Sequence, residues 1–209
     1  MSTEGKATDI AKRRYNRIAP LYDLMEGLIE RSRYSKWREF LWSKVGGTHI
    51  LEVGVGTGKN FPYYPADAEI TAVDFSEKML ERAKDKANKQ KVKVHLQQMD
   101  VQNLEFEDNT FDTVVASFVF CSVPDPCRGL MEVHRVCKQG GKVVLLEHVV
   151  SANRILGWLM NIANPIVVRM AGANINRWTV ENVKKGGLAV EQATDLWGGI
   201  FKLIEARKV

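Results

Sequence analysis

The chain has 209 residues, of which 45% are apolar and 26% are charged, values that are typical of one ordinary globular domain. Its formal net charge of +5 is too small to indicate nucleic-acid binding in a chain of this length. No apolar run reaches the length that spans a bilayer, and the N-terminal residues lack the apolar core of a signal peptide, so neither membrane insertion nor export is expected.

The 3 cysteines, Cys121, Cys127 and Cys137, have neither paired spacing nor the spacing of metal ligands. An odd number of cysteines without a secretion signal indicates reduced thiols. We therefore expect a cytoplasmic protein and no metal site.

Helical periodicity runs through residues 8–45 and is broken at Pro20, which predicts two or three helices. Two basic segments in this region, residues 12–17 and 31–38, are interleaved with aromatic residues. Such a pattern is typical either of a solvated helix face or of a surface for anionic lipid head groups.

Strands and helices alternate through the rest of the chain. This alternation predicts a mostly parallel α/β sheet with helices on both faces, completed by an antiparallel last strand. The final two strands are close enough to pair as a hairpin. The expected strands are residues 48–53, 68–75, 92–100, 111–120, 142–150, 188–196 and 199–209, and the expected helices are one directly after a glycine loop at 54–58, then 76–90, then 126–138.

The glycine loop does not have the spacing of a phosphate-binding loop. A triphosphate-binding loop needs four residues between its glycines and a hydroxyl after the lysine, but three residues separate Gly54 from Gly58, and Lys59 is followed by Asn60. The dinucleotide pattern is also missing, since the third glycine comes one position too early.

Two acidic residues indicate a different ligand. Glu52 lies two positions before the first glycine in an apolar strand, where a carboxylate would repel a pyrophosphate and attract an ammonium or a sulfonium. Asp74 lies 20 residues after Gly54, at the end of the second strand, where a carboxylate can hold ribose hydroxyls. A nucleoside with a cationic tail is therefore predicted, and S-adenosylmethionine fits that description. The alternative is that Glu52 caps another group or points to solvent at the edge of the sheet.

The segments LEVGVGTG, AVDFSEKMLERA and MDVQNLEFEDNTFDTVV resemble the motifs of the class I S-adenosylmethionine-dependent methyltransferases. The resemblance covers nearly the whole chain and implies a Rossmann-like, doubly wound sheet of seven strands. The implied contacts are Glu52, Gly54 and Gly56 with the methionine moiety, Asp74 with the ribose, Phe75, Met79, Asp100 and Val101 with the adenine, and Ser117 at the closed end of the site. For Met79 the alternative is a place in the helix core, and for Ser117 it is a hydrogen-bonded hydroxyl at the end of a strand.

The segment YNRIAPLYD, residues 15–23, is similar to the start of the quinone C-methyltransferases and of the bacterial phosphatidylethanolamine N-methyltransferases. In those enzymes it folds over cofactor and substrate, which implies that Tyr15 and Tyr22 belong to a lid, with Tyr22 beside the cofactor and the reacting groups. The fourth strand lacks the Asn/Asp-Pro-Pro-Tyr signature of enzymes that methylate bases or glutamine. We therefore expect a small acceptor and no nucleic acid.

The region after the fifth strand carries the predictions about the acceptor. His148 at the end of that strand is the candidate base, with a hydrogen-bonded structural histidine as the alternative. Residues 153–177 contain three arginines, no acids and many apolar residues. They are expected to form either a buried pair of helices or an apolar lid and membrane-surface patch over a lipid-like acceptor.

We therefore expect a single methyltransferase domain, residues 1–209, acting on a small hydrophobic or lipid-borne acceptor. It divides into an N-terminal helical lid (1–45), a cofactor-binding core (46–150), a helical insert (151–187) and a C-terminal strand pair (188–209). Phosphatidylethanolamine-type N-methylation is preferred, with quinol C-methylation or alkyl-thiol S-methylation as alternatives, and peripheral contact with an anionic membrane is expected. A non-catalytic binding module and an RNA or protein methyltransferase are the remaining hypotheses.

Overall fold

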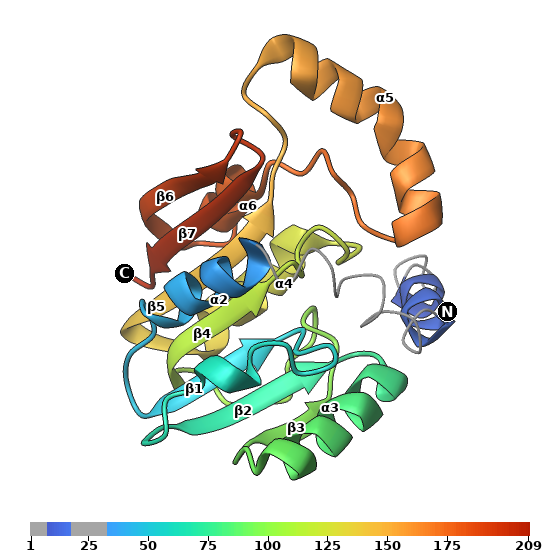
Figure 1. The fold of residues 1–209 in the computed structure, drawn as a ribbon. Coiled ribbons are helices and arrows are strands. Elements are labelled where there is room, and N and C mark those ends of the chain that lie inside the picture. Colours follow the sequence, from blue (N-terminus) through green and yellow to red (C-terminus); the bar gives the residue numbers. More distant parts are fainter. Residues whose placement is uncertain (1–7, 18–32) are drawn as a thin grey trace.

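A computed structural model describes residues 8–17 and 33–209. Its centre is a seven-stranded sheet in the order β3-β2-β1-β4-β5-β7-β6 (Figure 1). The strands are β1 (His49–Val53), β2 (Glu69–Asp74), β3 (His95–Gln98), β4 (Phe111–Ser117), β5 (Cys137–His148), β6 (Ala189–Trp197) and β7 (Phe201–Arg207).

The strand directions confirm the predicted mixed sheet. Strands β1 to β5 pair in parallel, while β7 runs antiparallel to both β5 and β6. From β1 the next strands in the chain, β2 and β3, are added toward one edge of the sheet, whereas β4 and the strands after it are added toward the other edge. The strand order therefore reverses between β1 and β4. In sheets of this type the crevice at the carboxyl ends of such strands is where ligands bind.

Helices cover both faces because the central strands are buried at nearly every position, as in β1 and β4, so both sides of the sheet need cover. The helices are α2 (Ser35–Trp42), α3 (Glu77–Gln90), α4 (Pro126–Val136), α5 (Arg154–Ala171) and α6 (Thr179–Lys185), and residues 8–17 form a further helix. Leu41 of α2 packs in one buried cluster with Ile50, whereas Leu130 of α4 packs in another with Leu51. Neighbouring residues of β1 therefore serve opposite faces of the sheet.

Three local predictions differ from the structure. The helix expected after the glycine loop is only a short 3-10 turn, Phe61–Tyr63, because Pro65 favours an extended backbone at Tyr64, which ends the turn. Helix α4 ends at Val136, before the expected glycine stop, because β5 already begins at Cys137, which pairs with Phe111. The insert is not a buried pair of helices.

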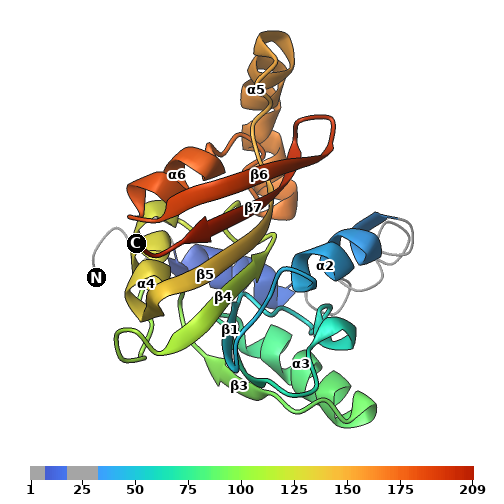
Figure 2. The same cartoon turned by 90° about the vertical axis from the view of Figure 1, so that its left-hand side faces the viewer.

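The insert contains one exposed helix and one packed helix. Helix α5 extends away from the sheet in both views (Figure 1, Figure 2), and Ile155 and Trp158 are 73% and 61% exposed. Helix α6 packs against α4 and β6, with Val183 fully buried. The helices predicted in the N-terminal region are present at residues 8–17 and in α2, whereas Pro20 and Tyr22 lie outside the described residues.

Candidate functional site

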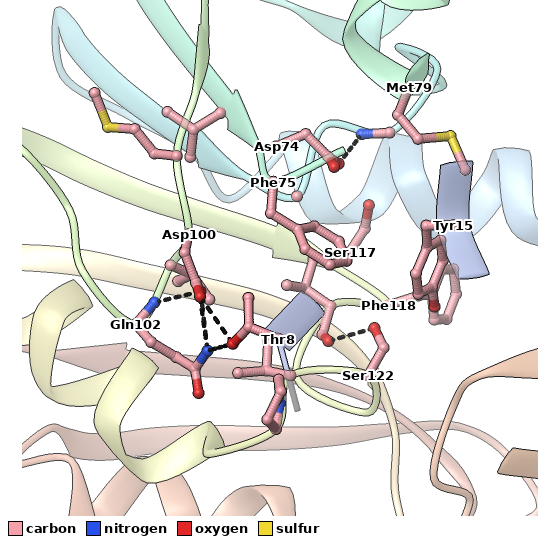
Figure 3. A pocket seen from close by; sticks show the side chains of 18 residues that line it. Thr8, Tyr15, Asp74, Phe75, Met79, Asp100, Gln102, Ser117, Phe118 and Ser122 are labelled. Carbon is pink, nitrogen blue, oxygen red and sulfur yellow. Dashed lines mark hydrogen bonds between the residues drawn. The ribbon is translucent and has the colours of Figure 1, made fainter. Parts of the chain in front are cut away.

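A pocket of about 700 Å³, its open mouth included, lies at the carboxyl ends of β1, β2 and β4 (Figure 3). It lies where the strand order reverses, as expected for a parallel sheet. The pocket is lined by Thr8, Tyr15, Gly54, Gly56, Val73, Asp74, Phe75, Met79, Met99, Asp100, Val101, Gln102, Ser117, Phe118, Val119, Ser122, Val123 and Pro124.

The glycine loop brings bare backbone to the wall of this pocket. Gly54 and Gly56 both have positive φ, +68° and +55°, which glycine adopts without strain. A Cβ on Gly54 would lie 2.4 Å from Cγ2 of Val119, so the loop and the segment after β4 can only pack this closely around a glycine. A Cβ on Gly56 would meet no atom within 4 Å, because the space beside it is open.

Asp74 is held in place by the backbone at the end of β2. The Gly56 amide donates to one of its carboxylate oxygens at 2.9 Å, and the Ser76 amide donates to the other at 2.8 Å. Burial raises the pKa of Asp74 to about 6, and the two amides oppose that shift. Each oxygen keeps a second lone pair, so the carboxylate can accept two hydroxyl donors from the pocket side.

Asp100 has partners that the sequence did not indicate. The Gln102 side-chain amide donates to both of its oxygens, at 3.0 and 2.9 Å, and the Thr8 hydroxyl donates at 3.2 Å. Gln102 in turn accepts from the amide of Asp125, the residue that caps α4. Asp100 therefore connects the pocket, the N-terminal helix and α4. No local motif marks Thr8 or Gln102, because both act through contacts between distant segments.

The helix of residues 8–17 closes one side of the pocket. The Tyr15 ring packs edge-on against Phe75, with 5.6 Å between the ring centroids, and the Ser76 hydroxyl donates to Asn16 at 2.5 Å. Met79 is 2% exposed and also lines the pocket, so its core position and its place at the site are compatible. Val101 lines the pocket beside them.

Glu52 lies behind the pocket and does not line it. It is fully buried, and it accepts from the Asn60 side-chain amide at 2.7 Å and from the Tyr64 hydroxyl. Burial raises the pKa of Glu52, while the bonds from Tyr64 and Asn60 oppose the shift. The contact of Glu52 with the methionine moiety therefore stays a prediction. Among the described residues, Asn60 links Glu52 to the pocket lining, because its side-chain amide also donates to Ser117 at 3.0 Å.

Arg38 is a component of this network that the sequence interpretation missed. One guanidinium nitrogen donates to Ser117 at 2.8 Å and to Asn60 at 3.0 Å, and the residue is only 4% exposed. Arg38 therefore belongs neither to a solvated face nor to a lipid-binding surface. Its helical spacing of three and four residues from Leu41 and Trp42, both buried, was the signal that placed it on the inner stripe of α2.

His148 lies at the end of β5 as predicted, but outside the pocket lining. Its ring packs edge-on against Phe201 at 4.9 Å, and the Phe201 ring lies 6.2 Å from that of Phe118, which does line the pocket. Burial lowers the pKa of His148, and its buried Nδ1 has no hydrogen-bond partner among the described residues. Tyr22, the other predicted catalytic residue, lies outside the described residues.

The neighbouring Glu147 faces the loop that follows β4. One carboxylate oxygen accepts from the amides of Val119 and Phe120 at 2.8 and 3.0 Å, so this side chain positions part of the pocket wall. The second oxygen is buried without a partner in the part of the chain that the structure describes. Burial raises the pKa of Glu147 to about 7.

The chemistry of the lining fits a nucleoside that carries a sulfonium. The described lining residues include the carboxylates Asp74 and Asp100 but no lysine, arginine or histidine. A pyrophosphate would find no cationic side chain in this described lining, whereas hydroxyls, an exocyclic amine and a positive charge find acceptors. The apolar side chains of Phe75, Met79 and Val101 provide flat contact area for a base.

Comparison with known sequences assigns the chain to a family. Residues 51–145 match the family described as "Methyltransferase domain". The chain is 41% identical over 142 residues to the phosphatidylethanolamine N-methyltransferase of Cereibacter sphaeroides, covering 67% of this chain and 68% of that protein. It is 34% identical to the ubiquinone/menaquinone biosynthesis C-methyltransferase UbiE of Geobacter sp. (strain M21), where the match spans 64% of this chain and 60% of the relative.

Solved structures share the fold. An S-adenosylmethionine-dependent methyltransferase of Thermotoga maritima superimposes with a TM-score of 0.72 at 23% identity, covering 93% of this chain and 98% of that one. The [4+2]-cyclase SpnF superimposes with a TM-score of 0.78 at 18% identity, covering 94% of each chain. Since SpnF is described as a cyclase, the fold alone does not establish methyl transfer. The family match and the sequence identity do so: the chain belongs to the class I S-adenosylmethionine-dependent methyltransferases (EC 2.1.1.-), whose methyl donor is S-adenosylmethionine.

Proposed function

We propose that this chain methylates a small, hydrophobic or lipid-borne acceptor and that the preferred acceptor is the amine of a phosphatidylethanolamine-type phospholipid. The observation that carries the donor site is the pocket at the carboxyl edge of the sheet, lined by two carboxylates and by no cationic side chain among the described residues. The identity of 41% to a phosphatidylethanolamine N-methyltransferase supports the acceptor.

Different residues around the pocket would bind different parts of the cofactor. Asp74 would accept both ribose hydroxyls, because its two oxygens are already fixed by backbone amides. Asp100 would accept the adenine amino group, and the adenine would pack on Phe75, Met79 and Val101. Ser117 would close the methionine end. The Arg38 guanidinium, bonded to that hydroxyl, would supply the positive charge that a methionine carboxylate requires.

The reaction needs alignment more than it needs a protein nucleophile. S-adenosylmethionine supplies a methyl carbon that is already activated by its sulfonium. The protein contributes orientation and exclusion of water, and positioning alone can give large effective molarities. Val119, Ser122 and Val123, which follow β4, form the wall nearest to the insert, and Glu147 holds the start of this segment. An acceptor would approach along this wall.

Quinol C-methylation is the second candidate, because the identity of 34% to a ubiquinone/menaquinone C-methyltransferase lies over a similar length of the chain. Both acceptors are carried by lipids. They differ in the atom that takes the methyl group.

The donor site is tested by thermal stabilisation with S-adenosylmethionine or S-adenosylhomocysteine. At about 100 times Kd, a ligand that binds only the folded state adds about 2.7 kcal/mol of stability. We expect this stabilisation in the wild type and in Asp85→Ala, an exposed carboxylate of α3, and its loss in Asp74→Ala. Equal stabilisation of all three proteins would contradict the proposed site.

The acceptor is tested with methyl-labelled S-adenosylmethionine and separate pools of phosphatidylethanolamine, quinols and alkyl thiols in detergent micelles. Label in the phospholipid amine is the expected result. Label only in the quinol or only in the thiol would replace the preferred acceptor by that alternative, and label only in added RNA or protein would refute the proposal of a lipid-borne acceptor.

A further inference from the structure

Helix α5 turns a continuous apolar face toward solvent. Ile155, Trp158, Leu159, Ile162 and Ile166 are between 49% and 73% exposed. Their spacing of three, four, seven and eleven residues from the first places all five on one side of a helix. Few soluble proteins expose a contiguous patch of large apolar side chains without using it for binding.

Polar contacts on the opposite side hold the helix in this orientation. The Asn164 side chain donates to Asn174 at 3.2 Å and accepts from the Ile175 amide at 2.8 Å, and Asn176 donates to Asn161 at 2.9 Å. Asn174 also donates to the carbonyl oxygen of Cys121, next to the pocket-lining Ser122. Asn161 and Asn164 thus fasten the inner side to the segment 174–176 and, through Asn174, to the loop after β4, so the exposed apolar side is the one that remains outside.

The charge around this face is positive. Helix α5 contains Arg154 and Arg169, both exposed, and no aspartate or glutamate. Its C-terminal end meets the helix of residues 8–17, since a Cβ on Gly172 would lie 2.8 Å from Cδ of Arg14 and 3.7 Å from the Tyr15 ring. Figures 1 and 2 both show the two helices on the same side of the molecule.

The helix of residues 8–17 has a matching outer side. Ile10, Arg13 and Arg17 are exposed and share a face by their spacing of three and seven residues. Thr8 and Tyr15 of the same helix line the pocket instead. This helix therefore separates the donor site from an exposed apolar and basic surface.

We propose that Ile155, Trp158, Leu159, Ile162 and Ile166, the docking face, insert into the surface of an anionic lipid bilayer, with Arg154, Arg169, Arg13 and Arg17 contacting its head groups. An apolar helix face with a tryptophan and flanking arginines is the pattern of helices that lie in the membrane interface. No helix within the described ranges is long and apolar enough to cross a membrane. The role of this docking rests on the proposed function, because a docked protein would hold its pocket beside lipid-borne acceptors.

The test measures binding to vesicles without any measurement of methyl transfer. Wild-type protein is co-sedimented with vesicles of phosphatidylcholine alone and with vesicles that contain phosphatidylglycerol. We expect binding to the anionic vesicles, weakened by salt, together with quenching of tryptophan fluorescence by brominated lipid. Absence of binding to anionic vesicles at low salt would overturn the proposal.

The variants separate the apolar from the electrostatic contribution. Ile162→Glu should lower the partition coefficient by about tenfold or more, as expected for the loss of a buried apolar side chain. Arg13→Ala and Arg17→Ala should each lower it by about fivefold, on anionic vesicles only. Met131→Glu, an equally exposed apolar position on α4, is the matched control and should bind like the wild type.

Two further results would overturn the docking face while leaving the proposed function intact. One is equal loss of binding in Ile162→Glu and Met131→Glu. The other is a wild type that does not bind vesicles and is a dimer by light scattering, while the Ile162→Glu variant is a monomer. That result would make the face a contact between two copies. Thermal stabilisation by S-adenosylmethionine should be the same in every variant, and its loss would indicate misfolding of that variant.

Discussion

At the scale of single residues, the site is built on carboxylates that end strands and lie in a buried environment. Asp74 and Glu147 use their ionised oxygens to accept backbone amides, and burial raises the pKa of both. Glu52 is fully buried like Glu147, and its two oxygens accept from Asn60 and Tyr64. Asp74 and Glu147 each fix a different segment of the pocket wall, whereas Glu52 fixes residues behind it.

The raised pKa of Glu147 predicts a pH dependence of stability. Its pKa rises from 4.5 in the unfolded chain to about 7 in the folded protein, so its ionisation opposes folding. The contribution of Glu147 to the free energy of unfolding is therefore largest below pH 4.5 and is lost as the pH rises through about 7. Asp74, with a pKa of about 6, acts in the same direction. Glu147→Gln keeps an acceptor for the two amides and should raise the free energy of unfolding at pH 8 by up to about 3 kcal/mol.

Denaturant titrations at pH 4.5, 6 and 8 would measure this effect. Glu132→Gln is the control with the opposite sign, because bonds from Arg135 lower the pKa of Glu132 and its ionisation therefore favours folding. The wild type should lose stability more steeply than Glu147→Gln and less steeply than Glu132→Gln. Identical slopes for the wild type and Glu147→Gln would show that Glu147 does not titrate in this window.

At the scale of elements, the loops determine the site while the strands only bring them together. The N-cap of α3 illustrates what is local: a serine directly before a helical pattern is typical of an N-cap, and the Ser76 hydroxyl accepts from the Met79 amide at 3.3 Å. The glycine loop illustrates what is not local. Its glycines are visible in the sequence, and Gly54 and Gly56 both line the pocket, but only the tertiary structure shows that Val119 packs against Gly54 while the space beside Gly56 is open.

This distinction predicts different effects of two similar substitutions. Gly54→Ala should destabilise the protein by about 2–4 kcal/mol, because a positive φ and a contact of 2.4 Å with Val119 both oppose the new Cβ. Gly56→Ala should cost only about 1–2 kcal/mol, from φ alone, but should weaken S-adenosylmethionine binding, because its Cβ would occupy open space at the pocket.

Urea denaturation and ligand-induced thermal shifts, measured on both glycine variants, would separate the two effects. A larger stability loss in Gly56→Ala than in Gly54→Ala would contradict the prediction.

At the scale of the whole molecule, the last strand in the chain lies inside the sheet. Strand β7 inserts between β5 and β6, with Leu203 buried on one face and Ile204 on the other. Leu203→Ala should therefore lower the free energy of unfolding by about 2–5 kcal/mol, as for other large-to-small changes in a core. Val209→Ala, at a 75% exposed position, is the control and should change stability by less than about 0.5 kcal/mol. Calorimetry of the two variants would measure both values, and equal melting temperatures would refute the central role of β7.

The sequence by itself predicted the alternation of strands and helices, the mixed sheet, a glycine loop without the spacing of a phosphate-binding loop, and S-adenosylmethionine as the cofactor. These follow from apolar periodicity, from the spacing of Gly54, Gly56 and Gly58, and from motifs, all of which are local. Only the tertiary structure decided that Glu52 is bonded to Asn60 and Tyr64 behind the pocket lining and that α5 turns its apolar side outward. The same holds for His148, whose ring packs against Phe201 outside the pocket lining. The physical reason is that the direction of a side chain at a strand end, or of a helix joined by loops, depends on packing against segments that are distant in the sequence.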